Sequence, residues 1–171
     1  FTDTVVRHVD ARTLEIPYWL LSFAELCDLL IDRTEREASN QIAFFRDILS
    51  ELKQLEKDPL GLVRVTVDTP VYFSLEVLLD RVVAKNTERV GNRQGPMFGD
   101  FDRMIMRLNS RKNDIRYDFL LKPQLRTSSG TLSGLLRDFV GLGEPKRAVT
   151  VIDLSSVPFD VRPTVAAQIG R

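Results

Sequence analysis

The sequence is poor in residues that bind metals or undergo redox chemistry. It contains one cysteine, Cys27, and one histidine, His8, among 171 residues. A single cysteine cannot form an internal disulfide, and one cysteine with one histidine is too small a ligand set for a zinc site. His8 lies in an apolar run and Cys27 in an apolar helical stretch, so we interpret both as structural residues.

The sequence also lacks an excess of either charge. It has 24 Lys and Arg residues against 24 Asp and Glu residues, which gives a formal net charge of +0. Without a net positive field, we expect this chain alone to bind neither nucleic acid nor an anionic membrane. The most apolar stretch, residues 17–21, is far too short to span a bilayer. No secretory signal is visible, so we expect a cytoplasmic protein.

No phosphate-binding loop is present. Gly91, Gly95 and Gly99 do not match the pattern G-x-x-x-x-G-K-[ST], and no apolar strand leads into them. No Ser-His-Asp set or catalytic carboxylate pair can be identified either. The content of 43% hydrophobic and 28% charged residues is ordinary for a globular domain of this length. Because the sequence starts at Phe1 and not at Met, we expect it to be part of a longer protein.

The sequence does contain strong helical patterns. Ser22 and Glu25 match a capping box before an apolar run, which predicts a helix start at that point. A long amphipathic helix is predicted over 36–57, where apolar residues recur at steps of three and four. Further helices are predicted over 75–83, 98–112 and 128–142, and from about 160. The glycine-containing stretch 86–99 is predicted to be a loop.

Four stretches favour strands. They are residues 4–9, an edge strand over 63–67, the stretch 114–123 ("DIRYDFLLKP"), and 148–154. The last stretch is nearly continuous in apolar residues, which is typical of a parallel strand buried on both faces. We expect the strand "RYDFLL" to be its crossover partner.

Asp153 lies at the carboxyl end of the last of these predicted strands. In nucleotide-hydrolysing proteins, an acid at the end of such a strand often holds magnesium. The alternative is that Asp-Leu-Ser-Ser only starts a turn, and the pattern taken alone favours this alternative.

Three arginines recur every four residues in the helix predicted over 98–112. Arg103, Arg107 and Arg111 would form a basic ridge, which makes them candidates for contact with DNA phosphates. Asp100 and Asp102 lie close to them in the sequence, and the alternative is a solvated helix face.

The closing stretch "AVTVIDLSSVPFDVRPTVAAQIGR" resembles a segment of the HerA-type translocases, which are hexameric P-loop ATPases of the HerA/FtsK group. In that family the segment lies shortly before the second acidic ATP-binding motif. The stretches "FTDTVVRHVDA", "IPYWLLSFAELCDLL", "DTPVYFSLEVLLD" and "DIRYDFLL" resemble family sequence in the same order, so that the resemblance covers nearly all of the chain.

The resemblance implies a mostly helical α/β fold, in which a helical insertion joins part of a parallel-sheet, RecA-like P-loop core. Residues 1–11 would be a piece of core strand, 12–113 the insertion, and 114–171 a strand–helix–strand–helix part of the core. The phosphate-binding loop would precede Phe1 and the catalytic acid would follow Arg171. In the parent protein, Asp153 and Ser155 would then lie near the nucleotide, without a catalytic role.

The resemblance also implies cofactors and partners for the parent protein. It would be a homo-hexameric helicase or translocase that uses ATP and magnesium to move double-stranded DNA, with a nuclease as a candidate partner. This segment alone would be inactive and would bind no cofactor. The alternative function is an autonomous helical protein-interaction module without catalytic activity.

Overall fold

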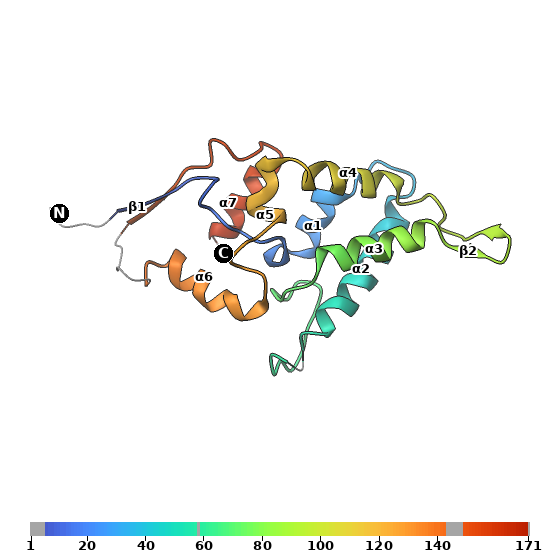
Figure 1. Cartoon of the computed structure of the whole chain (residues 1–171), viewed down its shortest axis with the longest axis horizontal. Coiled ribbons are helices and arrows are strands. Elements are labelled where there is room, and N and C mark those ends of the chain that lie inside the picture. The colour runs from blue at the N-terminus through green and yellow to red at the C-terminus, as the bar shows by residue number, and fades with distance from the viewer. Residues whose placement is uncertain (1–5, 58, 143–148, 171) are drawn as a thin grey trace. The chain divides into compact units, whose positions relative to one another are not determined.

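The computed structural model describes residues 6–57, 59–142 and 149–170. The chain divides into two compact units, each with its own internal packing (Figure 1). Unit 1 combines residues 1–18 with 114–171, and unit 2 is the continuous stretch 19–113. Within the described residues, no helix is both long enough and apolar enough to cross a membrane.

Unit 2 is built from helices and one small hairpin. Its helices are α1 (Phe23–Leu30), α2 (Ala38–Gln54), α3 (Leu75–Asn86) and α4 (Asp102–Lys112). A short 3₁₀ helix, η1 (Tyr18–Leu20), contains the point in the sequence where unit 1 gives way to unit 2. Strands β2 (Arg89–Val90) and β3 (Arg93–Gln94) pair antiparallel between α3 and α4, in the stretch that was predicted to be a loop.

The capping box predicted for α1 is confirmed. The Ser22 hydroxyl accepts a hydrogen bond from the backbone N–H of Glu25, and the Glu25 carboxylate accepts one from the backbone N–H of Ser22. The long amphipathic helix is α2, which buries Phe45 and Leu49 completely. The Phe45 ring lies 5.6 Å from the ring of Phe23 on α1, and this contact joins the two helices in the core of unit 2.

The edge strand predicted over 63–67 is wrong, because this stretch pairs with none of the strands among the described residues. Two side chains at the end of α2 bind its carbonyl oxygens in place of a neighbouring strand. Gln54 donates a hydrogen bond to the carbonyl of Val65, and Lys53 donates to the carbonyls of Val67 and Thr69. The segment is therefore fixed against α2 by side chains and not by a β-ladder.

Unit 1 contains a two-stranded parallel sheet and several short helices. Strands β1 (Val6–Val9) and β4 (Val149–Ile152) pair in register, with Val6 opposite Val149 and Val9 opposite Ile152. The helical elements are η2 (Ile115–Tyr117), α5 (Asp118–Leu121), η3 (Ser129–Thr131), α6 (Leu132–Phe139) and α7 (Arg162–Gly170). The prediction of a mostly helical α/β fold is confirmed, and its parallel sheet is a small one of two strands among the described residues.

The strand predicted over "RYDFLL" is wrong, because these residues form η2 and α5. The Asp114 carboxylate accepts a hydrogen bond from the backbone N–H of Arg116 and starts the helical turn. Tyr117, Leu120 and Leu121 are buried at the three- and four-residue spacing of a helix. The parallel neighbour of β4 is therefore β1, and β4 has no partner from 116–121.

The prediction that the last strand is buried on both faces is also wrong. Val149 and Val151 of β4 are each more than two-fifths exposed, and they share a face with the exposed residues Val6 and His8 of β1. On the other face Val9 is buried, while Thr150 and Ile152 are half-buried. The sheet is thus covered on one face only.

Candidate functional site

The carboxyl ends of β1 and β4 bring two carboxylates to one edge of the sheet. Asp10 follows β1 and Asp153 follows β4, and the two strands run parallel in register. The backbone N–H of Asp153 donates a 2.7 Å hydrogen bond to the carbonyl of Val9, which extends the ladder by one bond beyond β4. In open α/β sheets, ligands bind at this edge.

The Asp153 carboxylate is held by the turn that follows it. Its Oδ1 atom accepts a 2.8 Å hydrogen bond from the backbone N–H of Ser155. Hydrogen bonds from Ser155 lower the pKa of Asp153, while the nearby charge of Asp10 acts in the opposite direction. Asp153 is therefore ionised at neutral pH, and it is exposed. The predicted pair, Asp153 and Ser155, is brought together by this turn.

The sequence did not lead us to Asp10 as a candidate site residue, although its position in the chain resembles that of Asp153. The stretch "HVDAR" has the same form as "VIDLS", with an aspartate directly after a β-branched run. The guanidinium of Arg12 binds the Asp10 carboxylate with two hydrogen bonds of 3.0 and 3.2 Å, and this contact lowers the pKa of Asp10. Thr13 also donates to the same carboxylate through its backbone and hydroxyl groups. Most of its hydrogen-bonding capacity is thus used locally.

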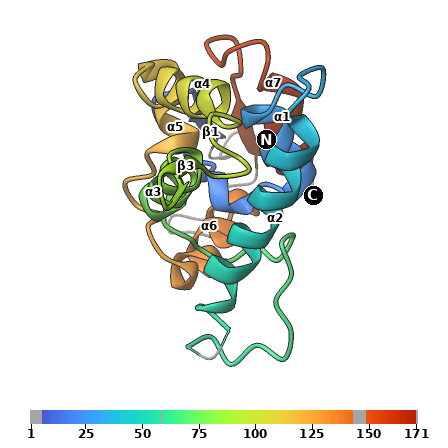
Figure 2. The same ribbon diagram turned by 90° about the vertical axis from the view of Figure 1, so that its right-hand side faces the viewer.

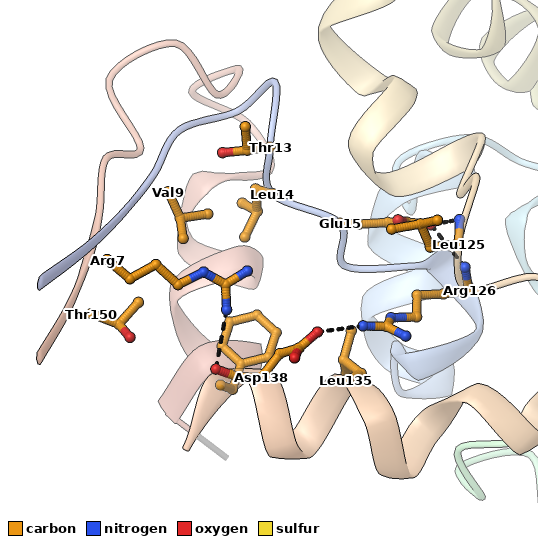
Figure 3. Close-up of a pocket in the computed structure, with 11 residues that line it drawn as sticks. Arg7, Val9, Thr13, Leu14, Glu15, Leu125, Arg126, Leu135, Asp138 and Thr150 are labelled. Atoms are coloured by element: carbon orange, nitrogen blue, oxygen red, sulfur yellow. Dashed lines mark hydrogen bonds and ion pairs between the residues drawn. The ribbon is translucent and has the colours of Figure 1, made fainter. Parts of the chain in front are cut away.

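Unit 1 also contains a small cavity of about 70 Å³, shown in Figure 3. Two arginines and two carboxylates lie around it. Arg7 donates to the carbonyl of Asp138 near the end of α6, and Arg126 forms a 2.7 Å ion pair with the Asp138 carboxylate. The Glu15 carboxylate accepts hydrogen bonds from the backbone N–H groups of Leu125 and Arg126.

These contacts show how the charged groups around the cavity hold parts of unit 1 together. The two positive charges are balanced by two negative ones, and the charged groups join β1, the 122–126 turn and α6. Drug-sized ligand pockets have volumes of roughly 300 Å³ or more. The cavity is therefore too small to enclose a nucleotide, and we interpret the cluster as packing within unit 1.

The three arginines predicted to form a basic ridge lie on α4, and each has a partner in unit 2. Arg103 lies 3.8 Å from the Glu35 carboxylate, and Arg107 lies 3.3 Å from that of Asp32. Arg111 donates a hydrogen bond to the carbonyl of Leu29 at the end of α1. A role of these arginines in DNA contact stays a prediction, and it would compete with these contacts.

The single cysteine and histidine occupy different environments. Cys27 is buried in α1, and burial raises the pKa of its thiol to about 11, so the reactive thiolate is disfavoured at neutral pH. His8 lies on the exposed face of the parallel sheet. Across residues 6–57, 59–142 and 149–170, no three His, Cys, Asp or Glu side chains are grouped to hold a metal ion.

Comparison with known protein families agrees with the resemblance in sequence. A search among curated proteins found no match to the chain. The family model described as "Helicase HerA, central domain" matches residues 1–171, all of the 171 positions. The chain therefore belongs to the family of HerA helicase central domains.

Proposed function

We propose that this chain is a structural part of an ATP-dependent DNA translocase of the HerA type. The observation that carries the proposal is the match of the HerA central-domain model to all 171 residues. In the complete protein, ATP hydrolysis with magnesium drives the movement of double-stranded DNA through a homo-hexameric ring. A nuclease that processes the moved DNA is the partner class we propose.

The parallel pairing of β1 with β4 supports this proposal. It places Asp153 and Ser155 at the carboxyl edge of the sheet, where α/β proteins bind nucleotides. A carboxylate and a hydroxyl are oxygen ligands of the kind that magnesium takes in proteins. Asp153 is ionised and exposed, so it fits a position beside a magnesium-bound nucleotide.

We propose that this stretch itself has a scaffolding role and no catalytic one. Its sequence contains no G-x-x-x-x-G-K-[ST] pattern, whose backbone N–H groups and lysine bind the phosphates in P-loop proteins. ATP and magnesium are accordingly cofactors of the complete protein and are held mainly by residues outside these 171. Asp153 and Ser155 contribute to the edge of that site by position and charge.

The test is ATP hydrolysis by the complete subunit that contains this segment. We expect Asp153→Asn to lower the rate, because the substitution removes the negative charge but keeps the Oδ1 acceptor of the turn. Asp47→Asn is the matched control, since Asp47 is an exposed carboxylate on α2. An unchanged rate of ATP hydrolysis in the Asp153→Asn variant would mean that Asp153 only forms the turn. A complete subunit that neither hydrolyses ATP nor binds DNA would instead support the interaction-module function.

A further inference from the structure

The hairpin of unit 2 is the most exposed ordered element of that unit. Strands β2 and β3 are joined by the two-residue turn Gly91-Asn92, and all six residues from 89 to 94 are exposed. Gly91 has a φ of 61°, whereas Asn92 has no positive φ, which is the backbone signature of a type II′ turn. Figure 1 shows the hairpin extending beyond the end of α3, and Figure 2 views it nearly from its tip.

The base of the hairpin is fixed to the helices. The backbone N–H of Gly95 donates to the carbonyl of Glu88, and the Glu88 carboxylate pairs with Lys85 of α3 at 2.6 Å. Asn86 is buried, and its side chain binds both the carboxylate of Asp102 and the backbone N–H of Phe101. An isolated two-stranded hairpin is marginally stable in water. This one is held at its base and presents its tip to solvent.

The two arginines of the hairpin are available to bind a partner. Neither Arg89 nor Arg93 forms an ion pair with a carboxylate in the part of the chain that the structure describes. The Arg89 guanidinium lies 5.9 Å from the centre of the Phe98 ring, a contact that leaves its hydrogen-bond donors available. The arginines of α4 differ, because each of them is bound to α1 or to the α1–α2 connection.

The chemistry of the tip fits a polyanion better than a protein surface. Residues 89–94 ("RVGNRQ") contain two arginines and two side-chain amides but no carboxylate and no aromatic residue. The anchors of protein interfaces are mostly Trp, Tyr and Arg in well-packed pockets, and this hairpin has no aromatic residue and Val90 as its single apolar side chain. Arg, Asn, Gln and backbone N–H groups are the donors that proteins present to DNA phosphates. A two-stranded β-ribbon also fits the major groove of duplex DNA.

We propose that the β2–β3 hairpin is a contact element for the phosphate backbone of duplex DNA. Arg89 and Arg93 lie on opposite faces of the ribbon, because Arg89 pairs with Gln94 and Arg93 with Val90. Arginines on opposite faces can reach phosphates on both sides of the ribbon. A contact of this kind with the phosphates does not depend on the base sequence. The proposal rests on the proposed function and adds to it the surface that touches the DNA.

The experiment compares charge removal at the tip with charge removal elsewhere in unit 2. Binding of the complete subunit to a random-sequence duplex is measured by fluorescence anisotropy over a salt series. The test variant is Arg89→Gln with Arg93→Gln, and the matched control is Arg36→Gln with Arg64→Gln. Arg36 and Arg64 are also exposed, and their loss changes the net charge by the same amount. Arg89→Lys with Arg93→Lys tests whether the charge itself matters.

For each hairpin that contacts the DNA, we expect the test variant to lose about two from the slope of log K against log salt concentration, since each phosphate contact contributes about 0.9. The binding should be weaker by about tenfold or more. The control should keep the wild-type slope, and the lysine variant should regain it. A test variant that matches the wild type, or a control that loses as much, overturns the role of the hairpin. If ATP hydrolysis persists in that case, the proposed function stands without this contact. A wild-type subunit that neither hydrolyses ATP nor binds DNA refutes both proposals.

Discussion

Lys53 is an unusual residue because its ammonium group lies inside unit 2. The residue is fully buried near the end of α2, and Nζ donates hydrogen bonds of 2.7 and 2.8 Å to the carbonyls of Val67 and Thr69. Burial lowers the pKa of Lys53 from 10.5 to about 8, while the charge of Asp68 acts to raise it. The neutral amine still has two N–H donors, so both carbonyl contacts survive loss of the proton.

This pKa makes the stability of the chain depend on pH in the alkaline range. In the unfolded chain Lys53 has the ordinary lysine pKa, so between about pH 8 and 10.5 the unfolded state binds more protons than the folded state. The free energy of unfolding should therefore rise with pH across this window, by up to about 3 kcal/mol for a difference of this size. Below the window both states are charged, and the folded state bears the full cost of the buried charge.

This pH dependence is measured by urea unfolding of the wild type and of the Lys53→Met variant, each near pH 7 and near pH 10.5. Other groups titrate equally in both chains, so the stability of the wild type relative to Lys53→Met isolates the contribution of Lys53. We expect this relative stability to increase at the higher pH. A relative stability that is the same at both pH values would contradict a buried ammonium with a depressed pKa.

At the scale of single residues, the sequence predicts contacts between near neighbours in the chain better than contacts between residues that are far apart in it. Asp153 and Ser155 could be paired from the sequence, because an Asx turn is local. The pairing of Arg126 with Asp138 could not, since it depends on how α6 packs in unit 1. Arg103, Arg107 and Arg111 were correctly seen as one helix face, but their contacts with α1 and the segment after it are tertiary.

At the scale of elements, the cap of α1 gives the simplest test of how sequence directs structure. The reciprocal hydrogen bonds between Ser22 and Glu25 satisfy two N–H groups at the start of the helix. We expect Ser22→Ala to cost about 1 kcal/mol of stability, as for other N-cap residues. Ser39→Ala is the control, because Ser39 is an exposed serine in the first turn of α2 that is not its N-cap.

Thermal or urea unfolding of the two variants against the wild type measures this difference. Equal stabilities of Ser22→Ala and Ser39→Ala would mean that packing alone fixes the start of α1. A loss well above about 2 kcal/mol would show that Ser22 does more than cap the helix.

The elements differ in how well the sequence predicts them, for physical reasons. Helix α1 was predicted from its capping box and helix α2 from its strong periodicity, and both signals are local. The strand over 63–67 was wrong because alternation alone does not supply a partner strand, and side chains of α2 bound its carbonyls instead. The hairpin was missed because its strands are only two residues each.

At the scale of the whole molecule, we expect the isolated 171-residue chain not to bind Mg-ATP measurably. The phosphate-binding pattern G-x-x-x-x-G-K-[ST] is missing from its sequence, so the groups that would hold the phosphates are missing. Titration calorimetry with Mg-ATP, and with magnesium alone as a control, measures this. Micromolar binding of ATP would mean that residues of this chain build a nucleotide site by themselves.

The isolated chain should also bind duplex DNA weakly, although the hairpin is proposed to touch DNA. Two arginines neutralise few phosphates, and the charges of the chain as a whole cancel. In a ring of several copies, the hairpins would act together, and the effective concentration of each contact would rise. Under the proposed function, we therefore expect strong DNA binding only from the assembled protein.

The parallel pairing of β1 with β4 has a consequence for how the chain folds as it is made. Val6 pairs with Val149, so β1 leaves the ribosome long before its partner strand is synthesised. All of unit 2 lies between them in the sequence and is complete first. A folded unit 2 holds its own two ends at a fixed separation, which lowers the entropy cost of bringing β1 and β4 together. A substitution that destabilises unit 2 should therefore slow the formation of the β1–β4 sheet, even where no residue of the sheet is changed.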